Sequence, residues 1–418
     1  MWPIVERLGA LSMTLMATPL PGLMQELLST VKIGWRAERG RLNLGPSDSL
    51  AQRELVSDVR CMPGQRVYRL GPEEVARDLR ALARRLFEAP FASFAACSAT
   101  QANQAVFRTL LQPGDRVLCL PDAELEATLD ALYVSATTPR LVRQRAVRLA
   151  NGLVDYPALI DQVLADPPRC IVAGYSSYTR HHDYRALRAL ADRVGALLVI
   201  DISRVAGLVA AGLHPSPLAW ADVLTGATHK SLQGPRGGFF MTRDEALFRR
   251  FQTVFDQRFG TVMPQRVQLG LLRCLQLARS PLQIAQQQLA LDNARAMAEV
   301  FNNQKLHVLS GGTDIQAVVL DSAALGLTGR QANVALGRLG ISLERRSDLE
   351  TTSLLLCTLP VSARGMGPQA CAHLASAIGS TLQQRHDLKT VTLAIASVDR
   401  LCADHPPLLS AMDHLLLQ

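Results

Sequence analysis

The sequence predicts an α/β fold in which a large domain has a mostly parallel sheet sandwiched by helices, followed by a smaller C-terminal α+β domain. Short, continuous apolar runs such as "CIVA" and "LLVID" alternate with stretches whose apolar residues recur at helical spacing. Continuous rather than alternating apolar runs are typical of strands buried on both faces of a parallel sheet. After about residue 280 the pattern changes to one long helix followed by shorter mixed segments.

The large domain is expected over residues 41–278. Its first clear helix is predicted over residues 71–89, where "GPEEVARDLRALARRLFEA" repeats apolar residues at helical spacing. A strand, a turn, a helix and a second strand are predicted over residues 91–121, with Pro-Gly-Asp in the last connection.

Three further strands are predicted within residues 169–177, 195–203 and 221–230, and a helix over 184–195 joins the first two. In an open α/β sheet, ligands bind at the carboxyl ends of the strands. The polar residues expected at those ends are Ser176, Asp201, Ser203, Thr228 and Lys230.

Residues 279–418 are expected to form the small domain, and residues 1–40 an N-terminal arm. The small domain begins with a Gln/Ala/Leu-rich helix. Its predicted segments are that helix over 281–303 and mixed segments over 307–321, 328–341 and 351–360.

The composition favours a globular protein without a nucleic-acid partner. Of 418 residues, 48% are hydrophobic, which is enough for a large core, and the net charge of +8 comes from dispersed arginines. Only 5% of residues are aromatic, so a nucleic-acid partner is not expected.

The cysteines and the N-terminus indicate a cytoplasmic protein. The eight cysteines are scattered without a C-x-x-C pair, which is typical of reduced thiols and gives no metal site. The opening segment lacks a basic n-region, and Pro19 and Pro21 interrupt it. No stretch reaches the roughly 18 apolar residues that a membrane span needs, so no membrane partner is expected.

Lysine is rare in this chain, and one lysine occupies a conspicuous position. There are four lysines, and the remaining 40 of the 44 basic residues are arginines. Lys230 lies in "ATHKSLQGPRGG", at the end of a predicted strand. An amine can lose its proton and attack a carbonyl, which arginine cannot do, so this position indicates covalent chemistry.

Together with Lys230, two other features match what pyridoxal phosphate requires. Asp201 ends an apolar run and is suitably placed to pair with a ring nitrogen. The turn "CSAT" before a predicted helix offers backbone N–H groups and the Thr100 hydroxyl to a phosphate. An amine, a carboxylate and a phosphate cup are the protein groups that this cofactor needs.

These residues resemble the serine hydroxymethyltransferase family of fold-type I pyridoxal-phosphate enzymes. The segment 201–238 is similar to the family's most distinctive block, and 98–115, 310–314 and 327–333 agree too. The resemblance implies a fold-type I transferase with pyridoxal 5'-phosphate as cofactor. It also implies a homodimer with shared active sites and a small-molecule amino acid or amine substrate.

The resemblance also implies residue roles. Lys230 would form the internal aldimine, Asp201 would pair with the pyridine nitrogen, and His229 would flank the aldimine. Tyr68 would join these three as a catalytic residue. Cofactor contacts are expected from Ser98, Ala99, Thr100, Ser176, Asp201, Ser203, Arg204, Thr228, His229 and Lys230. Substrate contacts are expected from Ser47, Arg60, Tyr68 and Arg236.

Several positions depart from the family pattern. Arg204 stands where the family has a His that contacts the ring hydroxyl, and Ala127 falls at the His that stacks on the ring. Arg60 replaces the Glu that acts at the folate end. Leu355 replaces the Arg that binds the substrate α-carboxylate, and leucine cannot make a bidentate ion pair. Further departures are Asp58 and Val67 at tyrosine positions, "ERR" at 344–346 and "MPQRVQLG" at 263–270.

Because the cofactor anchors are mostly kept and the substrate and folate groups are largely lost, we expect an enzyme acting at the α-carbon of a different amino acid or amine. Arg60, Arg204 or Arg236 would bind an anionic substrate group. A protonated guanidinium cannot serve as a general base, so folate dependence is not expected. Two alternatives remain: a non-catalytic cofactor-binding paralogue with a regulatory or structural role, and an ordinary serine–glycine hydroxymethyltransferase.

Overall fold

The computed structural model describes residues 42–43, 72–120, 128–129, 142–145, 151–176, 178–260, 263–343 and 353–406. The expected N-terminal arm and the candidate residues Ser47, Arg60 and Tyr68 lie outside them, as do Asp58, Val67, Ala127 and 344–346. None of the described helices is both long and apolar enough to cross a bilayer.

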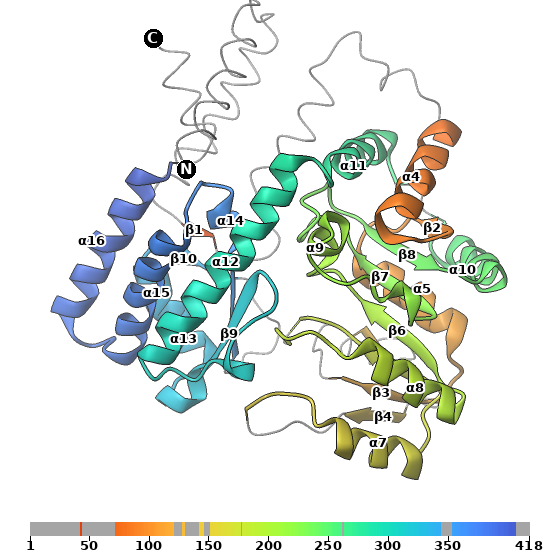
Figure 1. The fold of residues 1–418 in the computed structure, drawn as a ribbon, viewed down its shortest axis with the longest axis horizontal. Coiled ribbons are helices and arrows are strands. Elements are labelled where there is room, and N and C mark those ends of the chain that lie inside the picture. Colours follow the sequence, from red (N-terminus) through yellow and green to blue (C-terminus); the bar gives the residue numbers. More distant parts are fainter. Residues whose placement is uncertain are drawn as a thin grey trace, which may run out of the picture. The chain divides into compact units, whose positions relative to one another are not determined.

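A seven-stranded sheet forms the centre of the larger part, in the order β2-β8-β7-β6-β5-β3-β4 (Figure 1). The pairs β3–β4, β3–β5, β5–β6 and β6–β7 are parallel, whereas β8 runs antiparallel to both of its neighbours. The mostly parallel sheet predicted from the sequence is therefore confirmed. Its strands are β2 (Phe91–Ser93), β3 (Arg116–Cys119), β4 (Val142–Arg145), β5 (Cys170–Ala173), β6 (Leu197–Asp201), β7 (Val223–Ala227) and β8 (Gly238–Thr242).

Helices pack on both faces of this sheet, because alternate side chains of each buried strand enter different hydrophobic clusters. On β5, for example, Ile171 belongs to one cluster and Val172 to the other. The first cluster includes residues of α4, α7, α8, α9 and α11, and the second includes residues of α5 and α10. Their bounds are α4 (Pro72–Phe87), α5 (Ala99–Leu110), α7 (Tyr156–Ala165), α8 (Tyr184–Val194), α9 (Ala206–Ala211), α10 (Glu245–Arg258) and α11 (Gln265–Leu277).

The long helix α12 (Pro281–Asn303) leads from these elements to a second group of helices and strands (Figure 1). Ser280 caps its start by accepting a hydrogen bond from Gln283 N. The second group consists of β9 (Ala317–Asp321), α13 (Gly329–Arg338), β10 (Ile341–Ser342), β11 (Ser353–Cys357), α14 (Leu359–Ser362), α15 (Pro368–Gln383) and α16 (Leu388–Asp404). The described residues also contain short elements: β1 (Leu42–Asn43), which pairs with β10, and the 3₁₀ turns η2 (Pro217–Ala219), η3 (Leu309–Gly311) and η4 (Ser322–Leu325).

The antiparallel pair β9–β11 lies between two cores. Leu355 and Cys357 belong to the first of the two clusters that cover the seven-stranded sheet, which we call the cluster under the large sheet. Leu354 and Leu356 belong to the cluster formed with α12, α13, α15 and α16. This alternation follows from the two-residue period of a strand. The two-stranded sheet therefore presents one face to each core. The boundary expected at residue 278 falls between α11 and α12 and stays a prediction.

Candidate active site

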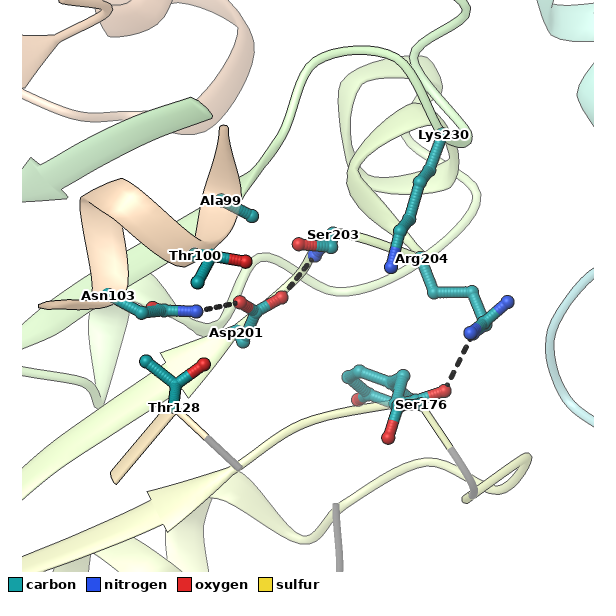
Figure 2. A pocket seen from close by; sticks show the side chains of 10 residues that line it. Ala99, Thr100, Asn103, Thr128, Ser176, Asp201, Ser203, Arg204 and Lys230 are labelled. Atoms are coloured by element: carbon teal, nitrogen blue, oxygen red, sulfur yellow. Dashed lines mark hydrogen bonds between the residues drawn. The ribbon is translucent and has the colours of Figure 1, made fainter. Parts of the chain in front are cut away.

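A pocket opens at the carboxyl ends of β5, β6 and β7 (Figure 2). Parallel strands end at the same edge of a sheet, so the polar residues that follow them meet there. The start of α5 closes another side. In Figure 2, Lys230 and Arg204 lie on one side of the view and Asn103 on the other, with Asp201 between them. The lining residues are Ala99, Thr100, Asn103, Thr128, Tyr175, Ser176, Asp201, Ser203, Arg204 and Lys230.

Asp201 is the last residue of β6, and its carboxylate is held by three protein donors. One oxygen, Oδ2, accepts hydrogen bonds from Asn103 Nδ2 at 2.8 Å and from Thr225 Oγ1 at 3.2 Å. The other, Oδ1, accepts from the backbone N–H of Ser203 at 2.7 Å. The residue is only 7% exposed. These bonds fix the carboxylate in one orientation and satisfy a buried charge.

Lys230 follows β7 in a loop that is stabilised by backbone hydrogen bonds between its own residues. The Thr228 N–H donates to Gly237 O at 3.0 Å, and the Gly234 N–H donates to Thr228 O at 2.8 Å. Gln233 takes a left-handed φ of 60°, which turns the chain back after the lysine. Lys230 is 8% exposed. The backbone of the lysine is thus held in place while its amine lines the pocket.

Two helices support this loop through Ser231. The Gly207 N–H at the start of α9 donates to Ser231 Oγ at 2.9 Å, and Gln287 of α12 donates from Nε2 to Ser231 O at 2.9 Å. A Cβ on Gly207 would lie 2.1 Å from Ser231 O, so only glycine permits this approach. Ser231, the residue after Lys230, is therefore anchored from both α9 and α12.

The start of α5 brings backbone N–H groups to the pocket. Ser98 is the N-cap and accepts a hydrogen bond from Gln101 N at 3.1 Å, and the Gln101 side chain accepts one from Cys97 N at 2.6 Å. A Cβ on Gly238 would lie 2.2 Å from Ser98 O, so the start of β8 packs directly on this turn. The N–H groups of Ala99 and Thr100 lie in the first turn, where a helix favours negative charge.

Arg204 is a buried guanidinium at the edge of the pocket, 3% exposed. Its Nε donates to the Tyr175 carbonyl at 2.9 Å, and its Nη1 lies 3.3 Å from the Cys357 thiol. The Gln316 side-chain amide donates to the Arg204 carbonyl. The side chain therefore reaches from the loop after β6 to the end of β11.

Behind Tyr175 lies a group of tyrosines and histidines. Burial raises the pKa of Tyr175, whose hydroxyl shares a hydrogen bond with that of Tyr184. The His214 ring packs edge-on against Tyr175 with centroids 5.4 Å apart, and its Nδ1 donates to Pro215 O at 2.9 Å. Burial lowers the pKa of His214 to about 3, so this histidine is neutral in the folded protein.

Seven of the residues expected at the cofactor line this pocket: Ala99, Thr100, Ser176, Asp201, Ser203, Arg204 and Lys230. Ser98 and His229 lie next to lining residues in the chain, Thr228 lies two residues before Lys230, and Thr228 and His229 are buried. Arg236 is exposed and is not among the lining residues. Segment 263–270, which departs from the family pattern, contains the start of α11, and Pro264 is the N-cap of that helix.

Three lining residues were not anticipated from the sequence: Asn103, Thr128 and Tyr175. Asn103 lies four residues after Ala99 in α5, so the helical period places both on one face and could have indicated it. Thr128 and Tyr175 carry no comparable spacing signal. Among the described residues, no group of three or more His, Cys, Asp or Glu side chains is arranged to hold a metal ion.

The fold and the lining of the pocket fit the class of pyridoxal-phosphate transferases, and comparison with known proteins gives the family. The family model for serine hydroxymethyltransferase matches residues 59–378. Serine hydroxymethyltransferase 2 of Pseudomonas syringae pv. syringae is 37% identical over 334 residues, 78% of this chain and 80% of that protein. Serine hydroxymethyltransferase 3 of Pseudomonas fluorescens is 36% identical, over 82% of this chain and 85% of that protein.

A serine hydroxymethyltransferase of Chromohalobacter salexigens is also 36% identical, over 82% of this chain and 85% of its own length. The chain therefore belongs to the serine hydroxymethyltransferase family. Enzymes of this family use pyridoxal phosphate and have the fold-type I architecture, so the fold class expected from the sequence is confirmed.

Proposed function

We propose that this protein binds pyridoxal 5'-phosphate through Lys230 and acts at the α-carbon of an amino acid or amine, with a specificity that differs from serine and folate. One observation carries the proposal. The amine of Lys230 and the carboxylate of Asp201 line one pocket at the ends of adjacent parallel strands, beside the first turn of α5. A primary amine, an oriented carboxylate and a helix N-terminus fit the aldehyde, the ring nitrogen and the phosphate of this cofactor.

Each group has a defined task in this proposal. When bound, the cofactor supplies an electron sink for negative charge at the substrate α-carbon. Asp201, held by Asn103, Thr225 and Ser203, keeps a proton on the ring nitrogen because its charge favours the protonated form. The N–H groups of Ala99 and Thr100 receive the phosphate.

The altered specificity is supported by the surroundings of Leu355. This side chain is 6% exposed and belongs to the apolar cluster under the large sheet. The neighbouring strand β9 places Val319 opposite it. An apolar side chain in an apolar environment offers no donor to a substrate carboxylate. The roles proposed for Ser47, Arg60 and Tyr68 at the substrate, and the loss of folate dependence, stay proposals from the resemblance.

Ordinary serine–glycine interconversion is the second candidate. It is favoured by the names of the relatives, which match this chain at 36–37% identity over about four fifths of its length. The non-catalytic paralogue remains the third reading. A homodimer with shared active sites and a cytoplasmic location also stay proposals that rest on the resemblance.

Covalent trapping tests the proposed function. We expect the protein incubated with pyridoxal phosphate and then borohydride to carry the reduced cofactor on the peptide containing Lys230, as located by mass spectrometry. Lys230→Ala should abolish the adduct, since an alkyl side chain cannot attack the aldehyde. Lys389→Ala, at an exposed lysine of α16, is the control and should leave the adduct in place. Trapping on another residue alone, or on none, would refute the proposal.

Exchange of substrate α-protons with deuterated solvent separates the three readings. The loaded enzyme should exchange the α-proton of at least one amino acid in a panel, and Lys230→Ala should not. A non-catalytic paralogue would carry the adduct but exchange nothing. An ordinary serine hydroxymethyltransferase would exchange the glycine proton faster when tetrahydrofolate is added, and that outcome would overturn the altered specificity.

A further inference from the structure

We propose that Gln287 and Gln283 of α12 are positioning residues for Lys230, because they fix the turn from which the lysine side chain enters the pocket. This inference rests on the proposed function, in which the Lys230 amine meets the aldehyde of the cofactor. Lys230 begins the turn of residues 230–233, which we call the lysine turn, and its side chain extends towards the pocket in Figure 2. Neither glutamine is among the lining residues of the described pocket, so each would act only through the turn.

The lysine turn contains a backbone conformation that needs support from outside. The Gln233 N–H donates to the Lys230 carbonyl at 3.1 Å and closes the turn. Gln233 takes a φ of 60°, in the left-handed region that residues other than glycine rarely occupy. Such a conformation persists only where the surroundings hold it, and its relaxation would reorient the peptide groups that follow the lysine. The direction of the lysine side chain therefore depends on contacts to this turn.

Two glutamines of α12 supply such contacts. Gln283 and Gln287 are four residues apart and therefore lie on the same face of α12, the helix beside α9 (Figure 1). Gln287 donates from Nε2 to the Ser231 carbonyl at 2.9 Å. Gln283 donates from Nε2 to Gln233 Oε1 at 2.9 Å. The first bond holds the backbone of the residue after the lysine, and the second holds the side chain of the left-handed residue.

The burial of these amides indicates that they do more than fill space. Gln287 is 0% exposed and Gln233 is 3% exposed. Gln287 Oε1 and Gln233 Nε2 have no hydrogen-bond partner among the described residues. Burying a polar atom without a partner costs free energy, and an apolar side chain of similar size, such as methionine, would avoid that cost. Packing alone therefore does not account for an amide at position 287, whereas its bond to the lysine turn does.

The helix that carries the two glutamines is itself bonded to the elements that follow β11. Asn293 of α12 is 0% exposed and donates from Nδ2 to Ser362 Oγ and to Met366 O, both at 2.8 Å. The Thr358 hydroxyl donates to Ala290 O at 2.5 Å. These bonds fix the middle of α12. The lysine turn is thus held by a helix that is anchored independently of the pocket.

The kinetics of covalent trapping test the positioning role. The protein is mixed with increasing concentrations of pyridoxal phosphate and quenched with borohydride at successive times, and mass spectrometry follows the adduct on Lys230. We expect Gln287→Met to lower the maximal rate of adduct formation by about 10- to 100-fold, because a displacement of about 1 Å between reacting atoms costs about that much. The half-saturating concentration should change by less than about threefold, because Asp201 and the start of α5 are unchanged. Gln283→Met should act in the same direction, with a smaller effect because Gln283 is only half-buried.

A matched control and a stability measurement exclude a purely structural role. Gln288→Met makes the same change in the same helix, but the Gln288 amide donates to Asp292 Oδ1 at 2.9 Å, so neither kinetic parameter should change. The urea midpoint of cofactor-free Gln287→Met should lie within about 0.5 M of the wild type, since the lost bond to Ser231 is offset by removal of an unpaired buried oxygen. An unchanged maximal rate in Gln287→Met, or equal changes in both kinetic parameters, would overturn the inference.

Amide hydrogen exchange of the cofactor-free protein measures the lysine turn without the cofactor. In Gln287→Met the N–H groups of Gln233 and Gly234 should exchange at least about tenfold faster than in the wild type, because the turn opens more often. Equal exchange rates in the two proteins would refute the positioning role even if the adduct forms. A wild type that forms no adduct at Lys230, with exchange that responds as expected, would refute the proposed function alone.

Discussion

At the scale of single residues, the carboxylate of Asp201 has a structural role and, in the proposed function, a chemical one, and substitution can separate the two. Asp201→Asn has nearly the same shape, and Asn103 Oδ1, which has no hydrogen-bond partner among the described residues, could accept from the new amide after a flip. Asp201→Ala would instead leave the donors of Asn103, Thr225 and Ser203 without their acceptor.

We therefore expect Asp201→Asn to change the free energy of unfolding of the cofactor-free protein by less than about 1 kcal/mol, and Asp201→Ala to lower it by about 2–4 kcal/mol. Both variants should slow α-proton exchange by at least about 100-fold, because neither keeps a charge beside the ring nitrogen. Urea unfolding and deuterium exchange measure the two effects. Equal stability of the two variants would contradict the structural part.

The sequence indicated the strand-end residues of the site because the edge of a parallel sheet gathers them. Ser176, Asp201 and Lys230 could be placed together in this way without any tertiary information. The contact between Arg204 and Cys357 could not be predicted, since it joins positions 153 residues apart on different elements. Between Arg204 and Arg236, packing decides which one lines the pocket.

At the scale of elements, the close approach of α9 to the lysine loop gives a direct test of the architecture. In Gly207→Ala the new Cβ would lie 2.1 Å from Ser231 O and 2.8 Å from Gln287 Nε2, so backbone must move. We expect a loss of about 1–3 kcal/mol in the free energy of unfolding, together with weaker trapping of cofactor at Lys230, because the adjacent loop shifts.

Gly337→Ala is the matched control in another helix. Gly337 is exposed in α13, has no heavy atom within 4 Å of an added Cβ, and takes no left-handed φ. Alanine there should stabilise the protein by about 0.5–1 kcal/mol through helix propensity. Thermal and urea unfolding of the two variants should move in opposite directions. A neutral Gly207→Ala would show that α9 and the loop are not in close contact.

The elements with local start and stop signals were predicted well. Helix α12 covers residues 281–303 as expected, because Ser280 supplies the N-cap and Pro281 the first turn. The antiparallel direction of β8 was not predicted. Its five residues, Gly238–Thr242, are all buried, and a fully buried run contains no signal for strand direction. That direction is set by the connection and by the partner strands.

At the scale of the whole molecule, the buried histidine behind the pocket makes stability depend on pH. The pKa of His214 is lowered from 6.5 to about 3, first by burial and then by His181 and His182, whereas the Pro215 carbonyl and Asp314 act in the opposite direction. Between pH 6.5 and 3 the unfolded chain binds a proton at this residue that the folded protein does not. The contribution of the neutral ring is therefore complete above pH 6.5 and is lost as the pH falls towards 3.

We expect His214→Asn, which keeps a donor for the Pro215 carbonyl, to reduce the slope of unfolding free energy against pH in this window by about 1.4 kcal/mol per unit, the value for one proton. Urea unfolding between pH 4 and 7 measures it. His386→Asn, at an exposed histidine between α15 and α16, should leave the slope close to that of the wild type. A slope unchanged by His214→Asn would mean that the ring is protonated in the folded protein.

The β9–β11 pair has a consequence for recombining this chain with its relatives. Leu355 and Leu354 belong to different cores, and the residues of β9 alternate in the same way. The sequence of each of these two strands must therefore be compatible with two sets of neighbours. A chimera spliced in front of α12 would import both strands and leave half of their contacts with a foreign sheet. A functional chimera would have to exchange the large sheet together with those side chains of β9 and β11 that belong to its core. The residues to exchange would therefore be chosen one by one within the two strands, and no single junction in the chain would suffice.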